Sequence, residues 1–320
     1  MPAVAGETNR NIFCRTQKSL MSEKRHGANG NSDLHGRRMR LFILGLGYSA
    51  RHFVRQHGAS FSHVAGTVRD PAQRADLGSM EAHPFSGSRP SRETIQRLRD
   101  ADVLLVSIPP GSAGDPAIAA FGDVLEGDRR KVVYLSTIGV YGDHGAAWVD
   151  ESTPPQAVLD RTRMRVAAEQ AWTDAARGDA AILRLAGIYG PARNALVTLR
   201  AGTARRIVKP GQVFNRIHVE DIASAIMAAI RHASGGIWNV CDDEPAPPQD
   251  VIAHAAKLMG MAPPPEEAFA TAEMSAMARS FYASSARVSN AKLKRELGVT
   301  LAYPTYRQGL EALWRAGEGR

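Results

Sequence analysis

The sequence lacks any apolar run long enough to cross a membrane, although 44% of its 320 residues are hydrophobic. A membrane-spanning helix needs about 18 or more consecutive apolar residues, so we expect no association with a membrane. The hydrophobic fraction is enough for a substantial buried core. The length allows one large domain or two of ordinary size, and the sequence shows no internal repeat.

Cysteine is almost absent. Cys14 and Cys241 lie far apart in the sequence and show no metal-binding spacing, so we expect no metal centre. Such sparse cysteine fits a protein of the reducing cytoplasm, and we interpret Cys241 as a small buried core residue.

Acidic residues are too few to balance the basic ones, and the net charge is +8. Residues 1–40 hold eight Lys or Arg and three Asp or Glu, which accounts for +5 of that total. The excess is therefore concentrated at the start of the chain, and we expect no nucleic-acid partner. Residues 1–38 show no sustained periodicity and predict a disordered basic leader.

The leader also contains no apolar signal core. A transit peptide is an alternative, which its acidic residues and missing amphipathic pattern disfavour. We expect Met39 to be the natural start, with the leader added by an upstream initiation site. Peptides from residues 1–37 in the endogenous protein would contradict this.

A glycine-rich turn follows the first apolar segment. Residues 39–44 predict a strand buried on both faces. Gly45 then allows a tight turn, Gly47 lets the backbone approach a pyrophosphate, and the next helix offers its free N–H groups to that phosphate. The alternative is a turn that merely joins strand to helix. The predicted cofactor contacts here are Gly45, Leu46, Gly47, Tyr48, Ser49 and Ala50.

The end of the second predicted strand, residues 63–68, lacks the acidic residue that NAD-specific sites use to hold the adenosine ribose. Arg69 stands there instead and offers a charged fork to a 2′-phosphate. Asp70 follows, and we expect it to cap the turn at Pro71. The pattern therefore favours NADP over NAD, against the alternative of an exposed arginine at a strand end.

Three further apolar segments, residues 101–110, 131–142 and 180–191, alternate with helical ones. This order predicts a Rossmann-like, doubly wound parallel sheet. Ligands of such sheets bind at the carboxyl ends of the strands. The later part of the chain predicts shorter elements, with helices at 194–206, 251–259, 266–279 and 287–298. Further predicted cofactor contacts are Ser107, Ile108, Pro109, Ser136, Ala186 and Ile188.

Six motifs occur in a specific order from Met39 to about Leu313: GxGxxA, TVRDP, STxGVYG, LRxxGIYGP, RIHVEDIA and WNVCDDEP. Together they resemble the extended short-chain dehydrogenase/reductase superfamily, in its NAD-dependent epimerase/dehydratase group. The resemblance implies a Rossmann domain at residues 39–186, to which 217–240 return. It also implies a smaller, discontinuous substrate lobe at 187–216 and 241–320. Extended members often dimerise through the helix at 159–177, so a homodimer is expected.

The same resemblance assigns the family's catalytic Ser/Thr to Thr137. Arg161 and Arg165 occupy the places of the Tyr and Lys of its YxxxK motif, so the chain resembles an atypical subgroup that lacks this motif. Arginine has no proton to exchange near neutral pH. Another acid must then serve, and the candidates are Tyr141, Asp143, His144 and Tyr189.

Two interpretations of Arg161 and Arg165 remain open. They form a solvated helix stripe with an Arg–Glu pair to Glu169, or they bind an anionic substrate or the cofactor phosphates. Arg193, Arg216 and His218 are the predicted substrate contacts, although a packed histidine is the commoner outcome. Phe214 stands where sugar-nucleotide epimerases carry an arginine, which disfavours a UDP-sugar.

Two functions fit these observations. The first is an NADP-dependent oxidoreductase or epimerase-like enzyme acting on a small hydroxyl or carbonyl substrate. The second is a catalytically silent NADP-binding sensor. A Rossmann site for a methyl donor fits less well, because Arg69 replaces the acid that such a site also needs.

Overall fold

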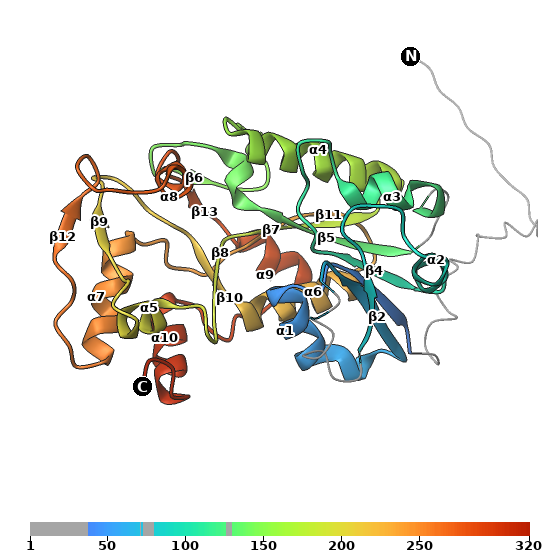
Figure 1. The fold of residues 1–320 in the computed structure, drawn as a ribbon. Coiled ribbons are helices and arrows are strands. Elements are labelled where there is room, and N and C mark those ends of the chain that lie inside the picture. The colour runs from blue at the N-terminus through green and yellow to red at the C-terminus, as the bar shows by residue number, and fades with distance from the viewer. Residues whose placement is uncertain (1–37, 71, 73–79, 126–129) are drawn as a thin grey trace, which may run out of the picture. The chain divides into compact units, whose positions relative to one another are not determined.

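The computed structural model describes residues 38–70, 72, 80–125 and 130–320, and it places residues 38–320 in one compact unit. The predicted leader lies almost entirely outside the described residues. A seven-stranded parallel sheet runs through this unit (Figure 1) in the order β11-β7-β5-β4-β1-β2-β3. Its strands are β1 (Arg40–Leu44), β2 (His63–Val68), β3 (Glu81–Pro84), β4 (Val103–Val106), β5 (Lys131–Thr137), β7 (Ala180–Leu185) and β11 (Gly236–Val240).

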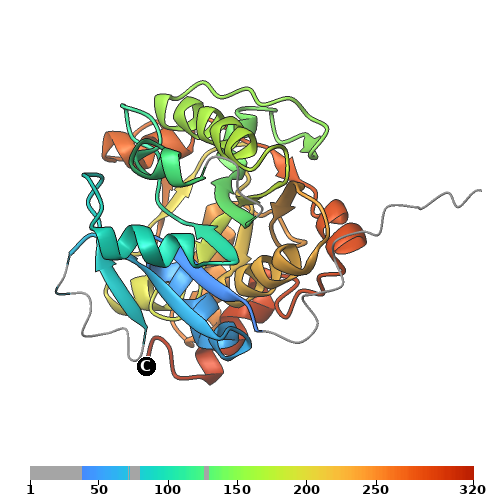
Figure 2. The same cartoon turned by 90° about the vertical axis from the view of Figure 1, so that its right-hand side faces the viewer.

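Helices cover both faces of the sheet, as Figures 1 and 2 show. Phe53, Ile222 and Leu293 bring α1 (Tyr48–His57), α6 (Val219–Arg231) and α9 (Ala291–Leu297) to one hydrophobic core. Leu98, Phe121 and Trp172 bring α2 (Arg92–Arg99), α3 (Pro116–Leu125) and α4 (Asp160–Ala175) to the other. Because both faces are covered, β4 is fully buried, and its run of apolar residues is explained. The predicted doubly wound fold is confirmed.

The strand order reverses between β1 and β4. β2 and β3 follow β1 on one side of this point, and β4, β5, β7 and β11 lie on the other. At such a reversal the loops after the two central strands turn in opposite directions and leave a crevice at their carboxyl ends. The glycine turn after β1 and residues 107–110 after β4 therefore border the place where a ligand is expected.

The remaining elements form a smaller lobe, at the left in Figure 1. Two further hydrophobic clusters of described residues are separate from the two cores that lie against the sheet. The lobe and its connections contain β8 (Gly187–Tyr189) paired with β10 (Arg216–His218), β9 (Arg206–Val208) with β12 (Glu266–Ala268), and β6 (Trp148–Val149) with β13 (Arg287–Val288). The helices are α5 (Ala195–Arg200), α7 (Pro248–Leu258), α8 (Ala276–Phe281) and α10 (Tyr306–Arg315). The residue boundaries predicted for the two lobes stay a prediction.

Two helices predicted in this lobe are wrong in extent. The segment 194–206 is helical only over α5, and 266–279 begins with β12 and is helical only from Ala276. Cross-strand contacts explain the difference, because Arg206 pairs with Glu266 at 2.7 Å between β9 and β12. Pairing with a distant strand outweighs local helix propensity here.

The helix predicted at 287–298 starts late, because residues 287–288 form β13 and α9 covers only Ala291–Leu297. Gly298 ends α9 in the left-handed conformation, with φ 64°, as expected for a helix-terminating glycine. Asn290 precedes α9, but its side chain does not cap the helix and instead donates to Cys241 O at 2.8 Å. None of the helices in the described ranges is both long enough and apolar enough to cross a membrane.

Candidate cofactor and substrate site

The turn after β1 is held by Thr67 of β2. The Gly45 N–H donates to Thr67 Oγ1 at 2.9 Å, and the Leu46 N–H donates to Thr67 O at 2.8 Å. Gly45 has a φ of 97°, and a Cβ there would lie 2.9 Å from Ile108 Cγ1. Packing against the loop after β4 therefore requires glycine at this position. Sequence reasoning missed Thr67, although it lies within the TVRDP motif.

Gly47 is different, because nothing in the described protein requires a glycine there. A Cβ at Gly47 would meet no atom within 4 Å, and its φ is −83°, which any residue can adopt. Gly47 precedes α1, whose first turn contains no acidic residue and receives no side-chain cap. Exposed N–H groups at the start of a helix are suited to a phosphate. The space over Gly47 and this helix start thus fit the pyrophosphate of a dinucleotide.

Ala50 is fully buried and Ser49 nearly so, which agrees with the small residue that the motif requires where the helix packs on the strand. Tyr48 donates from its hydroxyl to Pro191 O at 2.9 Å. This contact joins the start of α1 to the turn after β8. The guanidinium of the exposed Arg193 lies 5.7 Å from the centre of the Tyr48 ring.

The end of β2 carries one exposed basic side chain. Asp70 Oδ1 accepts from the Ala72 N–H at 2.9 Å, so the predicted capping role of Asp70 is confirmed. Arg69 has no hydrogen bond or ion pair to any residue that the structure describes. Its guanidinium is therefore available at the strand end where a dinucleotide's adenosine ribose is expected.

The loops after β4, β5 and β7 supply the other predicted contacts. The Ser107 N–H donates to Leu44 O at 2.8 Å, which places Ser107, the half-buried Ile108 and the exposed Pro109 beside the glycine turn. The Ala186 N–H donates to Val240 O at 3.0 Å, and Ile188 lies in β8, half-buried. Ser136 is buried and donates to Glu169 Oε1 at 2.5 Å. Its hydroxyl is thus engaged within the protein, and its contact with a cofactor stays a prediction.

Thr137 lies at the last position of β5 and is half-buried. Its Oγ1 accepts from the Gly139 N–H at 3.1 Å, and this bond caps the short 3₁₀ turn Ile138–Tyr141. A Cβ on Gly139 would lie 3.4 Å from Thr162 Cγ2 of α4. The structure therefore brings Thr137 and the first turn of α4 together, as the motifs predict.

Tyr141 does not reach this site. It is fully buried, its hydroxyl donates to Asn239 Oδ1 at 2.8 Å, and the Arg184 guanidinium lies 5.0 Å from its ring centre. Burial raises the pKa of Tyr141 above its ordinary value. We therefore correct the prediction that Tyr141 is a proton donor, because the core encloses it.

Two of the other candidate acids are engaged within the protein, and the third, Tyr189, is buried. Asp143 Oδ1 accepts from the Ser285 N–H at 2.8 Å, and His144 Nε2 lies 3.0 Å from Tyr141 O. Tyr189 is buried, and burial raises the pKa of its hydroxyl. Among the described residues, none of these groups is an exposed proton donor at the end of β5.

Arg161 and Arg165 extend from α4 in different directions. Arg161 Nη1 donates to Ser280 Oγ at 2.6 Å, and its guanidinium lies 4.8 Å from the centre of the Phe281 ring, both in α8. Arg165 Nη1 donates to Tyr134 Oη at 2.9 Å and to Leu135 O at 3.2 Å. Sequence reasoning missed the contact between Arg161 and α8, because no motif links residues that lie more than a hundred positions apart.

Glu169 does not pair with Arg165. It accepts from Arg184 Nη2 of β7 at 2.7 Å and also from Ser136, and both charged side chains are buried. The interpretation of a solvated Arg–Glu stripe along α4 is therefore wrong. The Glu169 carboxylate pairs with Arg184 because β5, β7 and α4 bury the two opposite charges together.

The predicted substrate residues Arg216 and His218 lie in β10, which leads from the smaller lobe into α6. Arg216 Nη1 donates to Phe214 O at 2.9 Å and Ala246 O at 3.1 Å. His218 accepts at Nδ1 from the Glu220 N–H at 3.3 Å, which caps α6. Burial lowers the pKa of His218 to about 4, so it is a neutral, packed histidine. The substrate role predicted for His218 is corrected accordingly.

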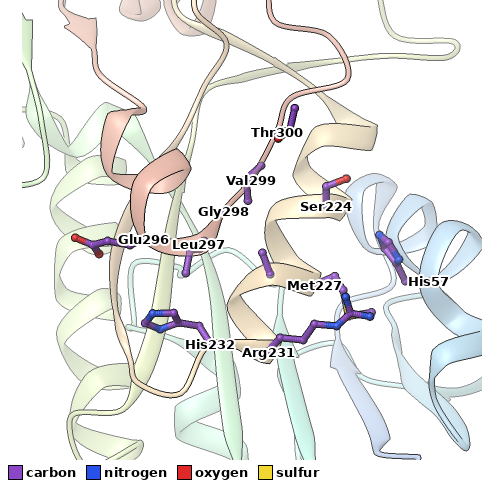
Figure 3. A pocket seen from close by; sticks show the side chains of 11 residues that line it. His57, Ser224, Met227, Arg231, His232, Glu296, Leu297, Gly298, Val299 and Thr300 are labelled. Atoms are coloured by element: carbon purple, nitrogen blue, oxygen red, sulfur yellow. The ribbon is translucent and has the colours of Figure 1, made fainter.

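A cavity of about 470 Å³ lies elsewhere, between α1, α6 and α9 (Figure 3). His57 and Arg231, which line it, belong to the last turns of α1 and α6. These helices run back from the carboxyl ends of the strands, so the cavity lies at the opposite end of the sheet from Gly47. Basic residues there complement the negative ends of the two helix dipoles.

One group of potential metal ligands, Glu81, His83 and Glu93, comes together at the edge of the sheet. Glu81 already accepts from Arg97 at 2.7 Å and contacts His63 and His83 at 2.8 and 3.1 Å. Its oxygens are therefore engaged, and we assign no metal to this group.

Comparisons with known proteins agree with this geometry. The model of the NAD dependent epimerase/dehydratase family matches residues 122–241. A solved structure of a functionally unknown conserved protein from Silicibacter pomeroyi DSS is 46% identical, covers 88% of this chain and 99% of that chain, and has a TM-score of 0.81. Protein YeeZ of Escherichia coli K12 is 27% identical over 250 residues, which is 69% of this chain and 84% of YeeZ.

UDP-glucuronic acid 4-epimerase from Bacillus cereus, solved in complex with NAD, has the same fold. It is 18% identical, with a TM-score of 0.68 over 88% of this chain and 99% of that chain. The matched family segment runs from α3 through β5, Thr137, α4 and β7 to the end of β11. Over residues 122–241 the chain matches the NAD dependent epimerase/dehydratase family, and its parallel seven-stranded sheet and glycine turn agree with the fold of that family.

Proposed function

We propose that this protein binds NADP and acts, as an epimerase, dehydratase or reductase-like enzyme, on a small hydroxyl or carbonyl compound. The observation that carries the proposal is the open space over Gly47 at the uncapped start of α1. Residues 45–50 would hold the pyrophosphate and Arg69 the 2′-phosphate. The bound nicotinamide would supply or accept a hydride, and the Thr137 hydroxyl would orient the substrate oxygen.

The preference for NADP is supported by Arg69, which is exposed and has no carboxylate partner among the described residues. In calorimetric titrations with NADPH, NADP, NADH and NAD, we expect selective binding of the phosphorylated pair. Arg69→Ala should weaken NADPH binding about 10- to 100-fold and leave NADH unchanged, since a charge-assisted hydrogen bond is lost. Arg99→Ala, the same change at the end of α2, is the control. Absence of all dinucleotide binding would refute the proposal.

Gly47→Val provides an independent test. The new side chain meets no protein atom within 4 Å of its Cβ, so the melting temperature should change little. It would occupy the space assigned to the pyrophosphate, so NADPH binding should be lost. Gly122→Val in α3 also meets no atom and should leave binding intact. Retained binding by the Gly47 variant would show that the cofactor lies elsewhere.

A second function, a catalytically silent NADP sensor, is favoured by one observation. Arg161 stands in place of a phenol, and Tyr141, Asp143, His144 and Tyr189 are buried or engaged within the protein. The sensor and the enzyme differ in turnover. Loss of NADPH absorbance with any member of a panel of small aldehydes and ketones would support the enzyme, whereas binding without turnover would support the sensor.

We also retain a homodimer through α4 and a cytoplasmic location as proposals. Sparse cysteine supports the location. The half-buried Met164 and Ala171 on α4 support the dimer, because they leave apolar surface on that helix. Light scattering of the purified chain should give the mass of a dimer, and the mass of a monomer would contradict this.

A further inference from the structure

The geometry points to a substrate that carries an oxyanion on an apolar body, recognised by Arg161 beside α8. This inference rests on the proposed function, because it places the substrate next to Thr137 and the predicted cofactor site. The oxyanion we infer is a carboxylate, and the body is aromatic or otherwise apolar.

Arg161 and Arg165 have no carboxylate partner among the described residues. Arg161 contacts only neutral groups: Ser280 Oγ at 2.6 Å, Met277 Sδ at 3.7 Å and the Phe281 ring. Arg165 likewise contacts only a hydroxyl and a carbonyl. Neither guanidinium forms an ion pair within the described ranges of the chain. Two half-buried cations one helical turn apart therefore lack a counter-charge.

Several other arginines pair with carboxylates, although Arg216 and Arg279 donate to backbone carbonyls. Arg163, which lies between the two on α4, pairs with Asp160, and Arg184 pairs with Glu169. Arg205 and Arg307 pair with Glu267 and Glu244 in the smaller lobe. A partly desolvated guanidinium without an anion is electrostatically unfavourable, and a bound carboxylate would relieve this through bidentate hydrogen bonds.

Exposed apolar side chains of α8 lie beside Arg161. Met277 and Phe281 of α8, which contact Arg161, are 60% and 55% exposed. Large apolar side chains that gather at one exposed place mark a binding site more often than scattered ones do. Here they flank a cation, and this combination fits a ligand with an apolar body and a charged end.

The alternative is that Arg161 only fastens α8 to α4. In that case its charge is incidental, and no small anion binds there. The two explanations differ in ligand binding, which a purely structural role would not produce.

The test uses benzoate as the probe and its neutral analogue benzamide as the matched ligand, titrated by calorimetry into the full chain with and without NADPH. Benzoate should bind at least about tenfold more tightly than benzamide, because only benzoate offers the charge. R161Q should weaken benzoate binding at least about tenfold. R161K, which keeps the charge without the planar fork, should fall between R161Q and the unchanged protein. R163Q, the same change on an exposed neighbour, should have no effect.

Melting curves of each variant separate a binding defect from a folding defect. Equal affinity for benzoate and benzamide, or equal benzoate binding by R161Q and R163Q, would overturn the inference. Binding of NADPH without benzoate would overturn the substrate class and leave the proposed function standing. Benzoate binding at Arg161 without binding of any dinucleotide would overturn the proposed function and leave the carboxylate site standing.

Discussion

Replacing Glu169 by alanine should destabilise the protein by about 3–5 kcal/mol, the usual cost of removing one partner from a buried ion pair. The Arg184 side chain is 3% exposed and the Glu169 side chain 8% exposed. Without the carboxylate, the Arg184 guanidinium would remain buried without its counter-charge, and the Ser136 hydroxyl would lose its acceptor. Chemical denaturation at pH 7 measures the difference.

Asp160→Ala is the control on the same helix. Asp160 pairs with Arg163, but their side chains are 85% and 58% exposed, so its loss should cost about 1 kcal/mol or less. A double variant, Glu169→Leu with Arg184→Met, should recover most of the stability, because no charge is then left buried. If Glu169→Ala costs no more than Asp160→Ala, the buried pair does not stabilise the fold.

The parts of this fold that the sequence predicted depend on local order along the chain. Apolar runs between helical segments predicted the strands, and glycines at fixed spacing predicted the turn after β1. Such features follow from the two-sided burial of parallel strands and from backbone freedom at Gly45, with its φ of 97°. Asp70 was predicted correctly for the same reason, since its hydrogen bond reaches only two residues ahead.

The errors concern contacts between distant segments. Glu169 pairs across the sheet with Arg184 rather than along its own helix, and Arg161 contacts α8 of the smaller lobe. Tyr141 lies near Thr137 in sequence, but its ring turns into the core to reach Asn239 of β11. Spacing along one chain cannot distinguish such partners, because each side chain has acceptable local and distant neighbours before the elements pack.

Asp242 has an unusual environment immediately after β11. It is 2% exposed, its Oδ1 accepts from the Glu244 N–H at 3.2 Å, and its Oδ2 is buried without a partner among the described residues. Burial raises the pKa of Asp242 to about 8, although its hydrogen bond to Glu244 and the charge of Arg216 partly oppose this. An unfolded chain has an ordinary Asp pKa of about 3.9. Between about pH 4 and pH 8 the folded protein therefore keeps a proton that the unfolded chain has released.

Stability should consequently fall as pH rises through this window, by up to about 6 kcal/mol in all, since each pKa unit corresponds to about 1.4 kcal/mol. Asp242→Asn keeps the acceptor and removes the titration, so it should match the unchanged protein near pH 4 and exceed it by several kcal/mol near pH 8. The lowered pKa of His218 reduces the stability of both proteins equally as pH falls below about 6.5. Its effect therefore cancels when the stability of one protein is subtracted from that of the other. Asp243→Asn removes the partly exposed pair with Lys294 and alters the acceptor of Asn290, but it keeps the Asp242 carboxyl, so its stability should still fall between pH 4 and pH 8. Denaturation curves from pH 4 to pH 8 that show a constant difference between the Asp242 variant and the unchanged protein would refute the prediction, because they would mean that Asp242 is ionised in the folded state.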